Sequence, residues 1–376
     1  MSQVDTAVAS ALKLTCARED LAHKAGVVAR AISQRTSVQV LAGVLLEAGD
    51  GQLALAATDM DLSLRASLAA DVELAGRAVV PGRLVVDVTR LLPDANVAIE
   101  YRPEEAAVSI TCGPAEYRLR TYSAEDFPRL PEVGDDVVSE IPGGSFLHTV
   151  ARVSRAASRD ESRPVLTGIL VRFENDKLVM AATDSYRLAV KETPLEGGVP
   201  ALEAIVPARA LGELARVAQG STTMRLGMQE NHVVFGTDEA WLTTRRIDGQ
   251  FPDYRQLVPE SFEHEVTFTR AELLDVVRRV SVMAQRNSPL RLRFEHGQVT
   301  ISAQTQDVGE ARETLPVPFA GEPLEMGFNA DFLREGIESV ETDEVTLKLI
   351  SPLRPGLIHA AEEGFWYLIM PIRLAG

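Results

Sequence analysis

Hydrophobic and polar positions follow the same order three times along the chain. Each stretch opens with apolar residues at helical spacing and continues with two short apolar runs separated by a turn rich in Gly, Asp and Asn. This order predicts a helix followed by a β-hairpin, and therefore antiparallel sheet. The three helical stripes are Leu21, Ala25, Val28 and Ile32, then Leu147, Val150, Ser154 and Ala157, then Leu273, Val277 and Val280.

Further strands and a second helix complete each stretch. The predicted hairpin strands are 44–46 with 52–56, 169–173 with 177–181, and 290–294 with 298–302. Second helices are predicted to begin near 82, 208 and 330, the first two beside a proline that suits a helix start. Closing strand pairs are predicted at 107–112 with 116–121 and at 345–350 with 356–359.

Short sequence repeats give the period of this pattern. Ala-Ala-Thr-Asp ends at Asp59 and again at Asp184, and a weaker copy surrounds Thr305. Phe-Pro pairs begin at Phe127 and Phe251. A unit of about 125 residues is large enough to bury a core of its own. We therefore predict an α+β protein of three similar tandem domains, at 1–130, 131–258 and 259–376, each with two helices packed on antiparallel sheets.

Composition narrows the possible functions. Hydrophobic residues make up 45% of the chain and charged residues 24%, as in ordinary globular proteins. No basic stretch with a long apolar run opens the sequence, so we expect a cytoplasmic protein. The formal net charge of −16 would repel DNA, so any role on nucleic acid must depend on local basic faces or on topology.

Metal and disulfide chemistry is not indicated. Cys16 and Cys112 are the only cysteines, which is too few for a disulfide framework, and we expect two buried thiols. The six histidines show no HxxxH or HxH spacing. We therefore predict no metal and no cofactor.

Four segments carry a family resemblance. Residues 163–168 (RPVLTG), 181–190 (AATDSYRLAV), 251–254 (FPDY) and 367–374 (YLIMPIRL) together resemble the bacterial DNA polymerase III β subunit, the β sliding clamp. The resemblance covers essentially the whole chain. It implies the DNA clamp fold as a head-to-tail ring dimer that encircles duplex DNA and tethers the replicative polymerase. It also implies a processivity factor without an active site of its own.

The resemblance places the helices around DNA, which would reconcile an acidic chain with a DNA-binding role. Basic residues on predicted helices would then contact phosphates without sequence preference. Each of these residues also fits an ordinary solvated helix face. The predicted DNA-facing residues are Lys24, Arg30, Arg83, Arg152, Arg155, Arg159, Arg209, Arg216, Arg278 and Arg279 on helices, and Arg35 in a loop.

The resemblance also implies one pocket per chain for short linear peptides of polymerases, the clamp loader and repair proteins, including mismatch repair. Arg187 and Arg373 would hold the peptide backbone or an acidic flank. For Met370 and Leu374, an alternative is a final strand that packs on its own domain. The predicted pocket residues are Leu166, Thr183, Ser185, Tyr186, Arg187, Leu188, Pro252, Leu257, Asn329, Phe332, Leu368, Met370, Pro371, Ile372, Arg373 and Leu374.

Some positions depart from the family pattern. Ser185-Tyr186 replaces a pair that is often glycine and histidine, and Asn287 stands where relatives place a large apolar residue. Both departures should change which peptides bind best. In the first repeat, residues 60–62 lack the Tyr-Arg pair of the second, which is why one pocket per chain is expected.

The dimer contact is predicted at an edge strand of the first domain. Val108 and Ile110 would meet Val282 and Met283 of the next chain, because unpaired strand edges favour pairing between chains.

Two other functions stay open at this point. A clamp paralogue could bind peptides as a scaffold without encircling DNA. An α+β hydrolase would use Asp184 with His148 or His232, although GxSxG, HExxH and GxxxxGK motifs are absent. We interpret Asp184 instead as a turn residue, because its equivalent Asp59 recurs in the first repeat.

Overall fold

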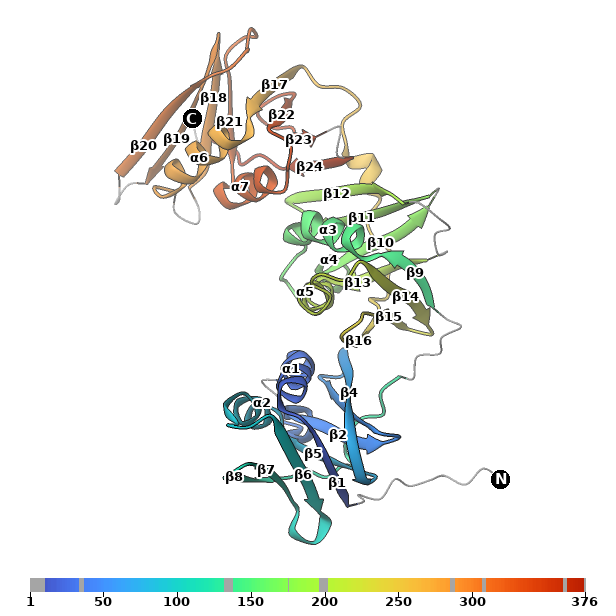
Figure 1. The fold of residues 1–376 in the computed structure, drawn as a ribbon. Helices are drawn as coiled ribbons and strands as arrows, with labels where there is room; N and C mark the ends of the chain where they lie inside the picture. The colour runs from blue at the N-terminus through green and yellow to red at the C-terminus, as the bar shows by residue number, and fades with distance from the viewer. Residues whose placement is uncertain are drawn as a thin grey trace. The chain divides into compact units, whose positions relative to one another are not determined.

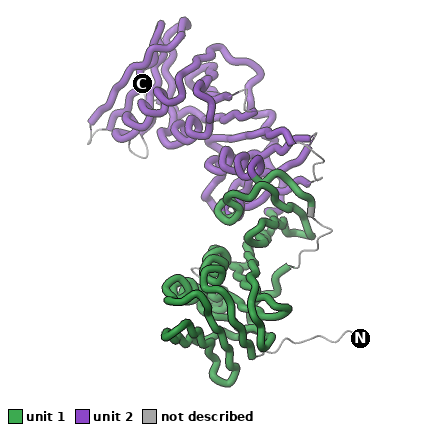
Figure 2. The backbone as a smooth tube through the Cα atoms, in the orientation of Figure 1, with its two compact units in different colours: residues 1–143, 213–246 green, residues 144–212, 247–376 purple. Residues whose placement is uncertain are grey.

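The computed structural model describes residues 11–33, 37–131, 138–174, 176–195, 202–284, 288–305, 309–360 and 364–374 (Figure 1). These residues form two compact units, shown in different colours in Figure 2. Unit 1 comprises residues 1–143 and 213–246, and unit 2 comprises residues 144–212 and 247–376. The unit boundaries cut through the middle repeat, so the predicted domain boundaries at 130 and 258 stay a prediction.

The helices begin close to where the sequence predicts them. The first helix carries Glu19 and Asp20 in its first turn, where negative charge suits a helix N-terminus, and it buries Leu21, Ala25 and Val28. The helices are α1 Arg18–Val28, α2 Gly82–Leu91, α3 Gly143–Val153, α4 Pro164–Thr167, α5 Ala208–Val217, α6 Arg270–Ser281 and α7 Ala330–Glu338. Short 3-10 turns are η1 Ala29–Ala31, η2 Gln39–Ala42, η3 Pro103–Glu105, η5 Ser154–Ala156 and η6 Tyr254–Leu257.

Unit 1 contains one twelve-stranded antiparallel sheet. Its main path runs β8-β7-β6-β1-β4-β16-β15-β14-β9, with β3, β2 and β5 joined to β4 off this path. The strands are β1 Leu12–Ala17, β2 Gly43–Gly49, β3 Gln52–Thr58, β4 Leu62–Leu74, β5 Gly76–Pro81, β6 Asn96–Arg102, β7 Ala107–Cys112, β8 Ala115–Arg120, β9 Val138–Pro142, β14 Thr223–Gln229, β15 His232–Gly236 and β16 Trp241–Arg245.

Unit 2 contains two antiparallel sheets. An eight-stranded sheet runs β13-β10-β11-β12-β24-β23-β22-β17, and a four-stranded sheet runs β20-β19-β18-β21. The strands are β10 Gly168–Glu174, β11 Lys177–Thr183, β12 Arg187–Pro194, β13 Glu203–Pro207, β17 His264–Thr269, β18 Leu290–Glu295, β19 Gln298–Thr305, β20 Gly309–Pro316, β21 Leu324–Phe328, β22 Glu344–Leu349, β23 Gly356–Ala360 and β24 Phe365–Ile369.

Each of the three predicted hairpins is present, as β2–β3, β10–β11 and β18–β19. Successive repeats are joined by strand pairing within a unit. In unit 1, β4 of the first repeat pairs with β16, and in unit 2, β12 of the second repeat pairs with β24. Each pairing extends a sheet past the end of one repeat, which explains why the compact units divide the middle repeat.

The buried face of the second-repeat helix differs from the prediction. Phe146, Val150, Val153 and Ala156 are the buried apolar residues, whereas Leu147, Ser154 and Ala157 are only partly buried. The helix turns its larger aromatic side chain, Phe146, into the core. The stripes of the first and third repeats are confirmed.

The edge strand of the first repeat is β8, which corrects the predicted dimer contact. Val108 and Ile110 lie in β7, between β6 and β8, and neither side chain has any exposed surface. They therefore cannot form a surface contact in this conformation. Val282 is 77% exposed, in line with the prediction for the third repeat.

No helix among the described residues is long and apolar enough to cross a membrane.

The Thr-Asp pairs form the same turn in the first two repeats. Asp59 Oδ1 accepts hydrogen bonds from the backbone N–H groups of Asp61 and Leu62, at 3.2 and 2.9 Å. Asp184 Oδ1 accepts from Tyr186 and Arg187, at 2.9 and 3.1 Å. The interpretation of Asp184 as a turn residue is confirmed, because its side chain satisfies backbone donors that no strand partner reaches.

Both turns place a non-glycine residue in the left-handed region. Met60 has φ +83° and Ser185 has φ +81°. A side chain at such a φ is strained, because its Cβ approaches the backbone. Met60 is 61% exposed, so its side chain contributes little packing in return.

Met60→Gly should therefore stabilise the protein by about 0.5–1 kcal/mol, after allowing for the extra freedom of glycine in the unfolded chain. Urea unfolding at equilibrium measures the change. Met60→Ala is the matched control, since it removes the same side-chain atoms but keeps the Cβ. A glycine variant no more stable than the alanine variant would contradict the strain argument.

Candidate functional site

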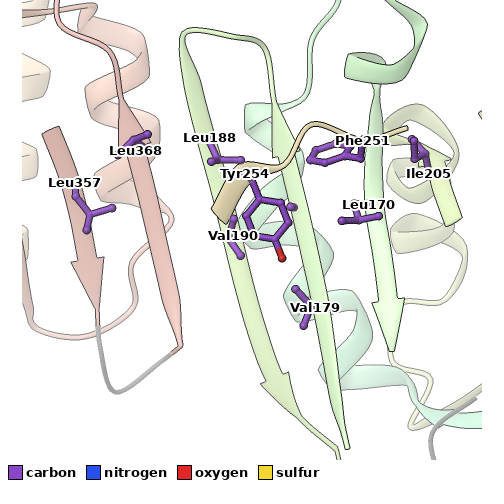
Figure 3. Close-up of a cluster of buried hydrophobic side chains, with 10 residues drawn as sticks. Leu170, Val179, Leu188, Val190, Ile205, Phe251, Tyr254, Leu357 and Leu368 are labelled. Carbon is purple, nitrogen blue, oxygen red and sulfur yellow. The ribbon is translucent and has the colours of Figure 1, made fainter. Parts of the chain in front are cut away.

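The candidate site lies where the second and third repeats join in unit 2, and it includes the predicted residues Leu188 and Leu368. Ten side chains form a buried apolar cluster there, and Figure 3 shows nine of them labelled. They come from β10 to β13, from the linker after residue 250, and from β23 and β24. They are Leu170, Val179, Ala181, Leu188, Val190, Ile205, Phe251, Tyr254, Leu357 and Leu368. We take this buried cluster as the floor of the candidate site.

Strand register sets the centre of that floor. Leu188 in β12 and Leu368 in β24 are direct cross-strand partners, 2% and 5% exposed. The backbone N–H of Met370 then donates to the carbonyl of Tyr186, at 2.8 Å. The turn after Asp184 and the C-terminal segment are thus held side by side, although Tyr186 and Met370 are 184 residues apart in sequence.

The C-terminal segment continues along β21. The Ile372 N–H donates to the Gly327 carbonyl at 2.7 Å, and a Cβ at Gly327 would lie only 2.6 Å from Leu374 Cδ2. Glycine at 327 is therefore what lets Leu374 lie against the strand. Leu374 packs on its own repeat, as the alternative interpretation held, whereas Met370 is 41% exposed.

Asn329 and Thr183 have structural partners in the site. Asn329 is the N-cap of α7, and its Oδ1 accepts from the Phe332 N–H at 3.0 Å. Thr183 Oγ1 donates to the Arg187 carbonyl at 2.6 Å. Both residues shape the site by fixing backbone, which makes direct ligand contact a secondary role for their side chains.

Arg187 has structural partners within unit 2, and its predicted contact with a peptide stays a prediction. Its side chain is 9% exposed, and Nε donates to Asp184 Oδ2 at 3.0 Å. Nη1 donates to Glu335 Oε2 and to Tyr367 Oη, and the guanidinium lies 4.2 Å from the Phe332 ring centroid. Through Nε and Nη1, Arg187 therefore ties the turn to α7 and β24.

Electrostatics around Arg187 favour its charge. Burial disfavours the guanidinium charge, but interactions with Tyr367 and Glu335 outweigh burial and raise the pKa of Arg187. Burial likewise raises the pKa of Tyr367, which keeps its hydroxyl protonated as a donor to the Phe332 carbonyl at 3.0 Å.

Arg163 lies at the site, although the sequence prediction did not include it. Its Nη1 donates to Ser185 Oγ at 3.1 Å, and its Nε donates to Asp160 Oδ2 at 3.0 Å. The side chain is 40% exposed. It begins the RPVLTG segment, so that segment already pointed to this position.

Several predicted residues keep exposed groups for a ligand. Tyr186, Leu257 and Met370 are 62%, 49% and 41% exposed, which is unusual for large apolar side chains and typical of binding surfaces. Pro252 and Arg373 are also exposed, and Leu166, Pro371 and Ile372 are partly buried. An apolar floor with an exposed aromatic, a methionine and two arginines suits an extended peptide.

Many of the predicted DNA-facing residues are paired with carboxylates. Lys24 Nζ lies 2.7 Å from Glu239 Oε2, and its side chain is 15% exposed. Arg279 forms a bidentate pair with Glu313. Arg83, Arg159 and Arg209 are exposed, and Arg35 and Asn287 lie outside the described residues.

The structure corrects the prediction that Arg152 faces DNA. The side chain is only 5% exposed, donates to the Ser339 carbonyl, and lies 3.0 Å from Glu341 Oε2. It also lies 5.7 Å from the Phe365 ring centroid. Arg152 therefore stabilises unit 2 from within and does not belong to an exposed basic face.

Two glutamates each hold a pair of arginines. Glu213 contacts Arg30 at 3.3 Å and Arg216 at 2.6 Å in unit 1. In unit 2, Glu338 contacts Arg278 at 2.9 Å and also pairs with Arg155. These arginines are 39–58% exposed, so each cluster keeps net positive charge near the surface.

A metal site or a hydrolase site in the described part of the chain would need suitably placed His, Cys, Asp or Glu side chains. That part of the chain contains no group of three or more His, Cys, Asp and Glu side chains placed to hold a metal ion. Asp184 is engaged by two backbone donors and Arg187, and His148 Nε2 contacts Glu341 at 2.9 Å. Unit 2 therefore does not present Asp184 as a free base.

Family models match the chain in three successive parts. They describe the N-terminal, central and C-terminal domains of the DNA polymerase III beta subunit, and they match residues 12–131, 140–253 and 255–373.

Individual proteins agree with the family models. The chain is 35% identical over 375 residues to the beta sliding clamp of Synechococcus elongatus, covering 96% of this chain and all of that protein. The crystal structure of the Bacillus subtilis sliding clamp matches with TM-score 0.92 at 26% identity, covering 97% of this chain and all of that one. A Bartonella birtlesii sliding clamp bound to griselimycin matches with TM-score 0.90 at 28% identity and the same coverage.

Arg187→Ala should destabilise the protein by about 3 kcal/mol, because it leaves the carboxylates of Asp184 and Glu335 partly buried without their partner. The shift in urea unfolding measures this loss. Arg373→Ala removes the same side chain from an exposed position and should change stability by less than about 0.5 kcal/mol. Equal losses in the two variants would contradict the structural role of Arg187.

Proposed function

This chain belongs to the DNA polymerase III β-subunit family of sliding clamps, and from this we propose that two copies form a head-to-tail ring that encircles duplex DNA and tethers the replicative polymerase. The observation that carries the proposal is the match of three successive clamp domains in order over nearly the whole chain. The proposal includes three domains with boundaries near residues 130 and 258.

Ring closure needs a free strand edge at each end of the chain. The strand β8 ends the sheet of unit 1, and β20 ends the four-stranded sheet of unit 2. Such edges carry unpaired backbone groups that can pair with another chain. We assign the contact to β8 of one protomer and to the third repeat of the next, near β20, Val282 and Met283.

DNA would be held by topology and only lightly by charge. The chain has a net charge of −16, and helix arginines such as Arg30 and Arg155 are paired with glutamates. Little excess positive charge is therefore left to bind phosphates. Weak and sequence-independent phosphate contacts allow sliding. Arg30, Arg155, Arg278 and the exposed Arg83, Arg159 and Arg209 are the side chains we assign to such contacts.

Partners would dock through the site in unit 2. Its floor is apolar, and Tyr186, Leu257 and Met370 supply exposed anchoring surface. Methionine in particular adapts to partners of different shape. We assign to this site short linear peptides of the replicative polymerase, the clamp loader, repair polymerases and mismatch-repair proteins. We assign no active site, and we place the protein in the cytoplasm, where the bacterial chromosome is copied.

A ring should stay on closed DNA and leave open DNA. The purified protein should be a dimer of the 40.8 kDa chain by light scattering. When a clamp loader and ATP place it on nicked circular DNA, it should stay bound through gel filtration, and it should be lost once the circle is cut.

Retention on the linear product would show direct DNA binding and not encirclement. A protein that is monomeric and binds partner peptides normally would identify the scaffold alternative.

Deletion of residues 370–376, which removes both Met370 and Arg373, should abolish binding of a fluorescein-labelled polymerase peptide in fluorescence anisotropy, with the dimer intact. The deletion also uncovers Gly327, so Met370→Asp is the sharper variant and should weaken binding at least tenfold. Met228→Asp is the matched control, because Met228 is 38% exposed on β14 in unit 1. Unchanged affinity in Met370→Asp would refute the site assignment.

A further inference from the structure

Unit 1 has cavities at its own junction between repeats. A cavity of about 510 Å³ lies beside the linker that follows the first repeat, and its walls include Leu45, Phe127 and Arg129. A second cavity of about 250 Å³ lies over the β4–β16 pair, against Trp241. Both cavities are lined by Arg65 and Leu130, so they form one groove, which we call the first-junction groove.

The first-junction groove stands at the position of the unit 2 site, one repeat earlier. Both sites rest on buried clusters, and four members of each recur about 125 residues apart. The members are Leu45 and Leu170, Ala56 and Ala181, Val79 and Ile205, and Phe127 and Phe251. The same local fold therefore builds an equivalent buried cluster at both junctions.

Strand register extends the correspondence. Trp241 is paired with Arg65 across β16 and β4, and Trp366 is paired with Val190 across β24 and β12. These are the only two tryptophans of the chain, 125 residues apart. Each junction thus has one tryptophan at the same place in its sheet.

The chemistry of the two grooves differs. The pair Leu188 and Leu368, central to the unit 2 floor, is replaced at the first junction by Ser63 and Thr243. Both of these polar residues line the smaller cavity. The first-junction groove therefore keeps an apolar end at Leu45, Phe127 and Leu130, but its other end is polar.

Charged side chains along the whole groove indicate what it would bind. Arg65 and Arg129 are exposed, and neither forms an ion pair or side-chain hydrogen bond with the described residues. Arg77, Glu47 and Glu125 also line the larger cavity, and the two carboxylates, which stand among the arginines, disfavour a continuous phosphate backbone. A peptide can instead place individual carboxylates on the two arginines, in bidentate geometry.

We propose that the first-junction groove is a second docking site, which binds an extended segment of a partner protein with acidic residues on both sides of an apolar anchor. The anchor packs against Leu45, Phe127 and Leu130, and carboxylates reach Arg65 and Arg129. This goes beyond the function proposed for the unit 2 site, because it gives each chain a second ligand class.

The two tryptophans allow the two grooves to be observed separately. Trp366→Phe leaves Trp241 as the sole tryptophan, and Trp241→Phe leaves Trp366. The full-length dimer of each variant is titrated with the capped peptide acetyl-EDLFED-amide while tryptophan fluorescence is recorded. We expect a saturable change in the Trp366→Phe protein, and none with acetyl-KKLFKK-amide.

Charge reversal tests the contacts. In the Trp366→Phe background, Arg65→Glu and Arg129→Glu should each weaken the apparent Kd at least tenfold. Arg245→Glu is the matched control, since Arg245 is exposed on the same strand as Trp241 but lines neither cavity, and it should leave the Kd unchanged. Unchanged thermal unfolding of each variant shows that its fold is intact.

Three results would overturn the proposal. A fluorescence change only in the Trp241→Phe protein would place the peptide in the unit 2 site. Equal affinity of the Arg65→Glu and parent proteins would remove the charge contact, and saturation by a single-stranded oligonucleotide but not by the peptide would identify a nucleic-acid site. None of these results bears on ring retention, so the two proposals fail separately.

Discussion

Backbone pairing between strands of successive repeats is the constraint on which the other features depend. In unit 1 the β4–β16 pair aligns Leu64 with Leu242, and in unit 2 the β12–β24 pair aligns Leu188 with Leu368. A register shift of one residue would turn each of these side chains to the opposite face of its sheet. The apolar floor, the position of the C-terminal segment and the groove beside each tryptophan all follow from these two registers.

Features governed by local sequence were predicted well. A helical stripe, a hairpin and a Thr-Asp turn each depend on residues within a few positions, so the repeat period gave their order and nearly their bounds. The candidate site was proposed for a related reason. The segments at 181–190 and 367–374 are each continuous, and the family resemblance supplied their proximity, which no periodicity in this chain could show.

Roles that depend on distant partners were missed. Arg152 lies in an amphipathic helix and Arg187 follows a turn, and such local sequence predicts an exposed side chain. Their partners, Glu341 for Arg152 and Glu335 for Arg187, each lie about 150 residues or more away in the sequence. Edge identity is non-local in the same way: β7 and β8 have similar patterns, and only the order of the assembled sheet shows that β8 is outermost. The burial of an arginine depends on which residues pack against it in the folded protein, and those residues are distant from it in the sequence.

The two junctions use one scaffold with different chemistry at equivalent positions. Leu62 in unit 1 occupies the turn position that Arg187 occupies in unit 2. Leu242 in unit 1 likewise occupies the strand position of Tyr367 in unit 2. Leu62 and Leu242 are 2% and 1% exposed, so two buried leucines are enough at these positions for the junction to fold. An ionic cluster at such a place is seldom more stable than an apolar one, so stability alone does not explain Arg187. Its directional bonds to Asp184, Glu335 and Tyr367 fix the turn that carries Ser185 and Tyr186, and that turn is hydrogen-bonded to the C-terminal segment through the Tyr186 carbonyl and the Met370 N–H. The ionic cluster therefore positions this turn against the C-terminal segment.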